Sequence, residues 1–181
     1  MAVLLLVLAG CTAVPAGLTA VKPFEAERYL GRWFEIARLD HSFERGLTDV
    51  SADYEFRADG TLSVVNRGYD PSKGEWRVAR GRARFRGAAD TASLVVCFFW
   101  PFCGGYHVIE LDRQHYGYAL VAGPSRSYLW ILAREPRLSP ELLQALVARA
   151  AQLGFDTAGL IYVTHRGERQ LQRGLQISTP P

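Results

Sequence analysis

The chain has 181 residues and a formal net charge of +3, and hydrophobic residues make up 49% of it. This length and composition are typical of one globular domain and exclude a disordered chain or a collagen-like fibre. Its 21 basic and 18 acidic residues are interspersed, so no basic stripe predicts nucleic-acid binding, and three cysteines are too few for a disulfide scaffold.

The chain begins with an uncharged apolar run over residues 1–10, which ends directly before Cys11. This run is shorter than the ~20 residues that a membrane-spanning helix needs, and it is typical of a signal peptide. Small residues at Ala9 and Gly10 resemble the lipobox of bacterial lipoproteins, so we predict lipid attachment at Cys11. The alternative is an ordinary secretory signal in which the cysteine is incidental.

The residues around this signal lead to three further expectations. No basic residue precedes the run, as expected if the true start lies upstream of Met1 and the signal is truncated. Thr12 rather than aspartate follows the cysteine, so we expect a lipid-anchored protein of the outer membrane, on its periplasmic face. Residues 11–24 are rich in small residues and prolines, which predicts a lipidated N-terminus followed by a flexible tether.

A folded domain is predicted over residues 25–172, and it contains eight short runs rich in aromatic and β-branched residues. Turn residues such as Asp59-Gly60 and Pro71-Ser72 separate the runs. The runs predict strands at residues 32–39, 49–57, 61–69, 75–86, 92–99, 105–112, 117–123 and 127–134. Eight meandering strands predict an all-β fold, an eight-stranded antiparallel up-and-down barrel, because closure removes exposed strand edges.

One α-helix is predicted after the strands. Ser139 is a good N-cap, Pro140 suits the first helical position, and Gly154 ends the pattern. Apolar residues recur at helical spacing between these positions, so we expect this C-terminal helix to pack on the outer wall of the barrel. A last strand is expected at residues 160–164, and residues 173–181 are expected to form a loose tail.

Several segments resemble the lipocalin family. Gly31-Arg32-Trp33 matches its Gly-x-Trp signature, and residues 40–47 look like the loop that follows in the bacterial outer-membrane lipocalins. Residues 66–69, 104–112 and 128–134 extend the match, which covers residues 25–165. The resemblance, which extends to apolipoprotein D in animals, implies an eight-stranded calyx that holds lipids.

The resemblance also implies how the barrel is closed. In an up-and-down barrel the first strand begins at the end where the eighth strand finishes, so Trp33 and Arg134 lie at the same end. In lipocalins this arginine stacks over this tryptophan in a cation–π contact that seals the closed end. Gly31, Trp33 and Arg134 are therefore expected to be structural residues of barrel closure.

Alternation along the strands identifies the residues that face the interior, when the closure residues are taken as inward. The predicted ligand-binding residues are Ala37, Leu39, Ala52, Tyr54, Val64, Asn66, Gly81, Ala83, Val96, Phe98, Tyr106, Val108, Val121, Tyr128 and Trp130. Because many inward residues are small, we expect a pocket that a hydrophobic guest completes. The alternative is a barrel filled by its own aromatic side chains.

A fatty acid or a lysophospholipid is the expected guest, because each buried methylene contributes roughly 0.8 kcal/mol. Arg38, Arg45 and Lys73 are expected at the open rim, where they would attract a carboxylate or a phosphate; solvated surface charges are the alternative. Glu35 and Glu110 are expected inside the barrel near its closed end, paired with the arginine of closure, because an unpaired buried carboxylate is costly.

The remaining candidates concern chemistry. A disulfide between Cys97 and Cys103 is feasible in an oxidising compartment, and the sequence leaves its formation open. The four histidines form no catalytic or metal-binding motif, so we expect a binding protein without enzymatic activity, cofactor or metal. A lipid-modifying enzyme and an envelope assembly or adhesion protein that uses the barrel exterior are the alternatives, and monomer and homodimer both stay open.

Overall fold

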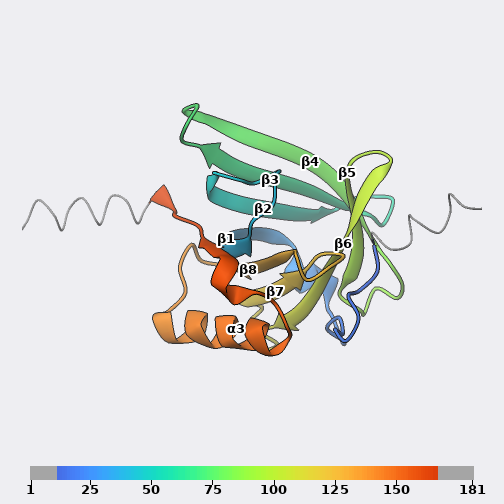
Figure 1. Ribbon diagram of the computed structural model, residues 1–181. Coiled ribbons are helices and arrows are strands. Elements are labelled where there is room, and N and C mark those ends of the chain that lie inside the picture. Colours follow the sequence, from blue (N-terminus) through green and yellow to red (C-terminus); the bar gives the residue numbers. More distant parts are fainter. Residues whose placement is uncertain (1–11, 167–181) are drawn as a thin grey trace, which may run out of the picture.

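The computed structural model describes residues 12–166, and nine strands of this part form one sheet that closes into a barrel (Figure 1). The strands are β1 (Gly31–Leu39), β2 (Thr48–Phe56), β3 (Leu62–Asp70), β4 (Glu75–Phe85), β5 (Ser93–Phe99), β6 (Phe102–Leu111), β7 (Tyr118–Ala122), β8 (Leu129–Ala133) and β9 (Leu160–Tyr162). Strands β1 to β8 pair in chain order, and β1 pairs with both β2 and β8. The predicted eight-stranded antiparallel barrel is confirmed.

The predicted helix is α3 (Pro140–Gln152), which lies along the outside of the barrel (Figure 1). The Ser139 hydroxyl caps it by accepting a hydrogen bond from the Leu142 amide at 3.2 Å. Its buried residues, Leu146 and Ala150, join a hydrophobic cluster with the outward side chains of β1, β7 and β8. Within residues 12–166, no helix is both long enough and apolar enough to cross a membrane.

Two hydrophobic clusters lie on opposite faces of the sheet. The inner cluster fills part of the barrel and includes Trp33, Val64 and Val121. The outer cluster lies between the sheet and α3. Strand β7 is therefore buried on both faces, whereas β4 exposes its outward arginines to solvent. This difference explains why β7 is a continuous apolar run and β4 alternates.

The segment before the barrel is packed, so the prediction of a flexible tether is wrong for residues 12–24. Leu18 and Phe24 are buried there. The Val21 amide donates to the Val108 carbonyl at 2.8 Å, and the Ala92 amide donates to the Val21 carbonyl at 2.9 Å. The apolar residues among the small ones therefore bind this segment to the barrel. Cys11 and the tail at 173–181 lie outside the described residues.

Candidate ligand-binding site

The closed end of the barrel is sealed by an arginine over a tryptophan. The Arg134 guanidinium carbon lies 4.0 Å from the centre of the Trp33 ring, and Arg134 donates to the Arg32 carbonyl at 2.8 Å. The Trp33 indole is fully buried and donates to the Tyr29 carbonyl at 2.8 Å, from the short helix α2 (Ala26–Tyr29). Gly31 has φ +86°, in the left-handed region where a Cβ is strained.

Three tyrosine hydroxyls meet just above this seal. Tyr29 and Tyr106 are 2.7 Å apart at their hydroxyl oxygens, and the Tyr54 hydroxyl donates to Tyr106 at 3.0 Å. The Tyr29 ring centre lies 4.6 Å from that of Trp33, which places the group near the closed end. Burial raises the pKa of all three hydroxyls, so they stay neutral. The aromatic filling considered as an alternative is thus realised in this lower part of the barrel.

Most of the predicted pocket residues line the interior above the tyrosines. The inner cluster contains Ala52, Tyr54, Val64, Ala83, Val96, Phe98, Tyr106, Val108, Val121 and Trp130. Gly81 faces Phe98, because a Cβ added to Gly81 would lie 2.8 Å from the Phe98 ring. Ala52, Val96, Phe98 and Trp130 are only half-buried although they face inward. These inward side chains therefore keep part of their surface accessible to solvent.

Two further predicted contacts lie at different heights: Asn66 lies beside Ala52, its register partner on β2, and Tyr128 lies at the open end, directly before β8. The side-chain oxygen of Asn66 is buried and has no hydrogen-bond partner among the described residues. The Tyr128 ring is stacked with those of Trp130 and His41, with centres 6.2 and 6.0 Å apart. An unpartnered buried acceptor is costly, so Asn66 is suited to receive a hydrogen bond from a guest.

Ala37 and Leu39 do not face the interior, and their predicted orientation is wrong. Both belong to the outer cluster that packs against α3. The register between β1 and β8 shifts between Glu35 and Ala37, so one extra residue reverses the alternation along the rest of β1. Arg38 consequently points inward and is buried, with 1% of its surface exposed, instead of lying at the open rim.

Glu110 is also placed differently from the prediction. The register between β6 and β7 shifts between Val108 and Glu110. The Glu110 carboxylate accepts a hydrogen bond from Arg149 on α3 at 3.0 Å, so it lies outside the barrel and is not paired with Arg134. Glu35 is inward and buried, but its partner is Arg38 at 2.6 Å.

A buried polar cluster joins β1 to the loop at residues 40–47. Besides its ion pair with Glu35, Arg38 donates to the Glu44 carbonyl at 2.7 Å. The Glu44 carboxylate accepts from the Trp130 indole at 3.1 Å and lies 3.2 Å from His41 Nε2. These contacts hold the loop against the inner wall of β8. The prediction missed Glu44 and His41, and their i,i+3 spacing is the signal that the sequence contains.

Burial sets the protonation of this cluster. It raises the pKa of Glu35 and of Glu44, and the neighbouring Glu44 carboxylate raises the pKa of Glu35 further. Burial, helped by the positive Arg38, lowers the pKa of His41 to about 4. The imidazole is therefore neutral at neutral pH.

We expect His41 to make the protein less stable in acid. The unfolded chain takes up a proton on His41 as the pH falls below 6.5, whereas the folded chain resists it down to about 4, so the free energy of unfolding falls across this window. Allowing for solvent screening, the loss attributable to His41 is about 2 kcal/mol. Urea unfolding at about pH 7.5 and about pH 4.5 measures it in the parent and in His41→Gln.

The exposed His115 supplies the control for this prediction. His115→Gln should lose as much stability in acid as the parent protein, and His41→Gln should lose less. The raised pKa values of Glu35 and Glu44 act in the opposite direction, but they are common to these proteins and cancel in the comparison. An equal loss in His41→Gln and in the parent would contradict the buried neutral imidazole.

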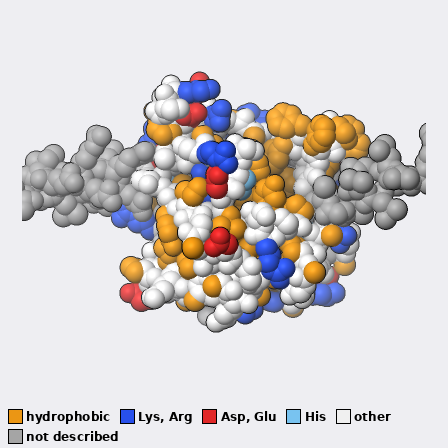
Figure 2. All heavy atoms as spheres, viewed as in Figure 1, with side chains coloured by type: hydrophobic (Ala, Val, Ile, Leu, Met, Phe, Trp, Pro, Cys, Tyr) orange, Lys and Arg blue, Asp and Glu red, His pale blue; other side chains and the backbone are white. Residues whose placement is uncertain are grey.

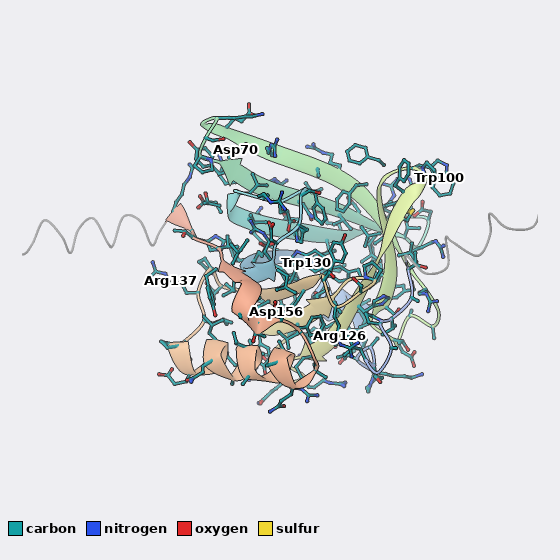
Figure 3. The ribbon with its side chains drawn as sticks, viewed as in Figure 1. Asp70, Trp100, Arg126, Trp130, Arg137 and Asp156 are labelled. Carbon is teal, nitrogen blue, oxygen red and sulfur yellow. A yellow bond between two sulfur atoms is a disulfide. The ribbon has the colours of Figure 1, made fainter. Side chains whose placement is uncertain are left out.

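A disulfide closes the β5–β6 hairpin at the open end. Cys97 and Cys103 are bonded, with their Cα atoms 4.2 Å apart. The residues between them at the tip are exposed, and Trp100 projects from the hairpin in Figure 3. Within residues 12–166, no cluster of histidine, cysteine or carboxylate side chains could hold a metal ion.

Two surface depressions of about 310 and 400 Å³ lie outside the barrel. The first is lined by outward residues that include Phe34, Arg67 and Trp76. The second lies between the N-terminal segment, at Leu18 and Ala20, and the end of β4. Neither depression includes the inward residues described above.

Comparisons with known proteins agree with this architecture. The chain is 53% identical over 153 residues to outer membrane lipoprotein Blc of Escherichia coli (strain K12), covering 84% of this chain and 86% of that protein. It is 49% identical to the Blc protein of Vibrio cholerae, covering 85% and 90%. Apolipoprotein D of Mus musculus is a more distant relative, 31% identical, with coverage of 74% and 72%.

The similarity to the bacterial proteins also gives the location. These relatives are outer membrane lipoproteins, and this chain is likewise a lipid-anchored protein of the outer membrane. Among solved structures, insecticyanin from the tobacco hornworm Manduca sexta has the same fold, with a TM-score of 0.65 at 18% identity over 84% of this chain and 87% of that chain. A family model described as a lipocalin-like domain matches residues 24–165. The chain therefore belongs to the lipocalin family.

Proposed function

We propose that this lipocalin holds a fatty acid or a lysophospholipid in its calyx, for storage, transport or membrane maintenance at the periplasmic face of the outer membrane. The observation that carries the proposal is the half-buried state of inward apolar residues, Ala52, Val96, Phe98 and Trp130. An acyl chain lying against them would remove this surface from water, with a gain of roughly 0.8 kcal/mol per methylene.

We place the acyl chain above the tyrosine hydroxyls and the head group towards the open end. Val64, Gly81, Ala83, Val108 and Val121 would surround the chain as part of the inner wall. The rings of Tyr128 and Trp130 would contact the polar end of the guest, and the unpartnered oxygen of Asn66 would face the guest lower in the calyx, beside Ala52. Cys11 is the proposed point of lipid attachment.

We infer that the protein binds lipid without converting it. Within residues 12–166 the two cysteines, Cys97 and Cys103, are held in a disulfide and so supply no thiol nucleophile. The buried contacts of Arg38 with Glu35 and with the Glu44 carbonyl serve to hold a loop. No cofactor or metal ion enters this function.

Native mass spectrometry of the full-length protein extracted from its own membrane tests the proposal. The expected result is one unchanged lipid molecule per chain, in addition to a mass on Cys11 that accounts for the anchor. Product formation in excess of the protein would support a lipid-modifying enzyme instead. An empty protein that takes up no fatty acid would support an assembly or adhesion role for the barrel exterior. The same spectrum distinguishes a monomer from a homodimer.

A further inference from the structure

Three large aromatic side chains are exposed at the tip of the β5–β6 hairpin. Phe99 is 76% exposed, Trp100 is 86% exposed and Phe102 is 79% exposed. Figure 2 shows hydrophobic side chains gathered at this edge of the molecule. The disulfide between Cys97 and Cys103 holds the base of the tip together. Single exposed apolar residues need no explanation, but a contiguous group marks an interaction site, and tryptophan favours the interface between membrane and water.

Arginines line the strand beside this hairpin. Arg80, Arg82 and Arg84 alternate on the exposed face of β4. Arg82 is paired in register with Cys97, so β4 runs alongside the approach to the aromatic tip. Arg82 has an ion pair with Asp59 at 3.7 Å, whereas neither Arg80 nor Arg84 has one among residues 12–166. Such free guanidinium groups attract the phosphates of anionic lipids.

The start of the described chain lies close to the same hairpin. The Thr12 carbonyl oxygen lies 3.1 Å from the position that a Cβ would take on Gly105 of β6. Gly105 is three residues from Phe102, which corresponds to about 10 Å along a strand. Residues 12–24 are packed on the barrel, so a lipid on Cys11 would be attached next to a fixed point and not at the end of a flexible tether.

We propose that the tip formed by Phe99, Trp100 and Phe102, together with Arg80 and Arg84, docks on an anionic phospholipid bilayer. The aromatic side chains enter the headgroup layer and the guanidinium groups bind phosphates beside them. The inference rests on one part of the proposed function, the lipid anchor at Cys11. This anchor would turn this side of the barrel towards the membrane. The open end then lies next to the bilayer from which a lipid guest is taken.

The docking is tested without the anchor, on the full chain carrying Cys11→Ser. Its binding to vesicles of phosphatidylcholine mixed with phosphatidylglycerol is measured by sedimentation, and quenching by brominated acyl chains reports insertion of tryptophan. We expect binding to the mixed vesicles, weak binding to phosphatidylcholine alone, and a loss of about tenfold or more in Trp100→Gln. Trp76→Gln is the matched control, because Trp76 is also exposed, at 49%, but lies on another hairpin.

The arginines are tested in the same way. Arg80→Gln/Arg84→Gln should weaken binding to the mixed vesicles and reduce its dependence on salt. The control is Lys73→Gln/Arg77→Gln at the β3–β4 hairpin, whose Asp70 lies at the opposite side of the molecule from Trp100 in Figure 3. Equal binding by Trp100→Gln and Trp76→Gln overturns the proposal. So does self-association that depends on Trp100 without vesicle binding, which would assign the tip to a second copy of the chain.

Fatty-acid binding measured in the same variants separates this inference from the proposed function. Trp100→Gln should keep the affinity of the parent for palmitate in solution while it loses vesicle binding. Vesicle binding that depends on Trp100 in a protein that takes up no palmitate supports the docking surface and contradicts the carrier function. Palmitate binding without any vesicle binding supports the carrier function and overturns the docking surface.

Discussion

Replacing Ala52 with phenylalanine is expected to lower the affinity for palmitate about 100-fold. Ala52 is half-buried on the inner wall and is paired in register with Trp33, which places it at the floor of the open part of the barrel. A phenyl ring there would displace about four methylenes of a long acyl chain, a loss of about 3 kcal/mol. Competition with a fluorescent fatty acid measures the change.

The length of the ligand supplies an internal control for this prediction. With its carboxylate at the open end, decanoate is not expected to reach the floor, so its affinity should change by no more than about twofold in Ala52→Phe. Glu55→Phe adds the same ring to the exposed outer face of β2 and should leave both affinities unchanged. If palmitate and decanoate were weakened equally in Ala52→Phe, the acyl chain would not lie along the barrel axis with its end at Ala52.

The second large effect concerns the stability of the closed end. We expect Trp33→Ala to lower the free energy of unfolding by about 4 kcal/mol. Trp33 is fully buried, and its removal leaves a cavity, a Tyr29 carbonyl without its donor at 2.8 Å, and an Arg134 guanidinium without the ring 4.0 Å away. Urea unfolding followed by circular dichroism measures the difference.

Trp76→Ala is the matched control for the closed end. Trp76 is 49% exposed on β4, where it touches Tyr69 and Arg166, so its removal should cost less than about 1 kcal/mol. Similar losses in the two variants would show that the packing over Trp33 is not what holds the barrel closed. Trp33 lies below the tyrosines and so outside the proposed ligand site. At temperatures low enough for Trp33→Ala to stay folded, this variant should therefore still bind short fatty acids.

The buried cluster at residues 40–47 gives the open end a defined structure. Arg38 holds the loop by its backbone at Glu44, and Trp130 holds it by the side chain of the same residue. The half-buried face of Trp130 also belongs to the inner wall. A guest that contacts Trp130 therefore contacts a residue whose position depends on the loop, which links the occupancy of the calyx to the packing of its rim.

Several features of this protein could be predicted from local patterns in its sequence. The period-two alternation and the regular turns predicted eight strands, and the Ser139-Pro140 start predicted α3. Strand count and direction alone bring Trp33 and Arg134 to the same end. These inferences succeed because hydrogen-bonding direction and side-chain alternation depend on neighbouring residues in the chain.

The orientation of Ala37, Leu39 and Glu110 was decided only by the tertiary structure. A bulge reverses the alternation of a strand, and its position depends on the register with the partner strand. On β1 the sequence offers no warning, because Ile36 and Ala37 are both apolar and both faces of this strand are buried. The burial of Arg38 follows from the same extra residue.

The sequence by itself determined the barrel and the helix on its wall, because each follows from the periodicity of short segments. The ends of the strands followed less closely, since β6 begins at Phe102 instead of residue 105 and β9 ends at Tyr162 instead of residue 164. The tertiary structure alone decided how residues 12–24 pack, which carboxylates pair with Arg38, and how far the tyrosines fill the interior. The N-terminal packing and the tyrosine contacts join groups that are far apart in the chain, and the pairing of Arg38 with Glu35 depends on the bulge that the register with β8 imposes on β1. The burial and hydrogen bonding of these groups exist only once the strands have closed around them.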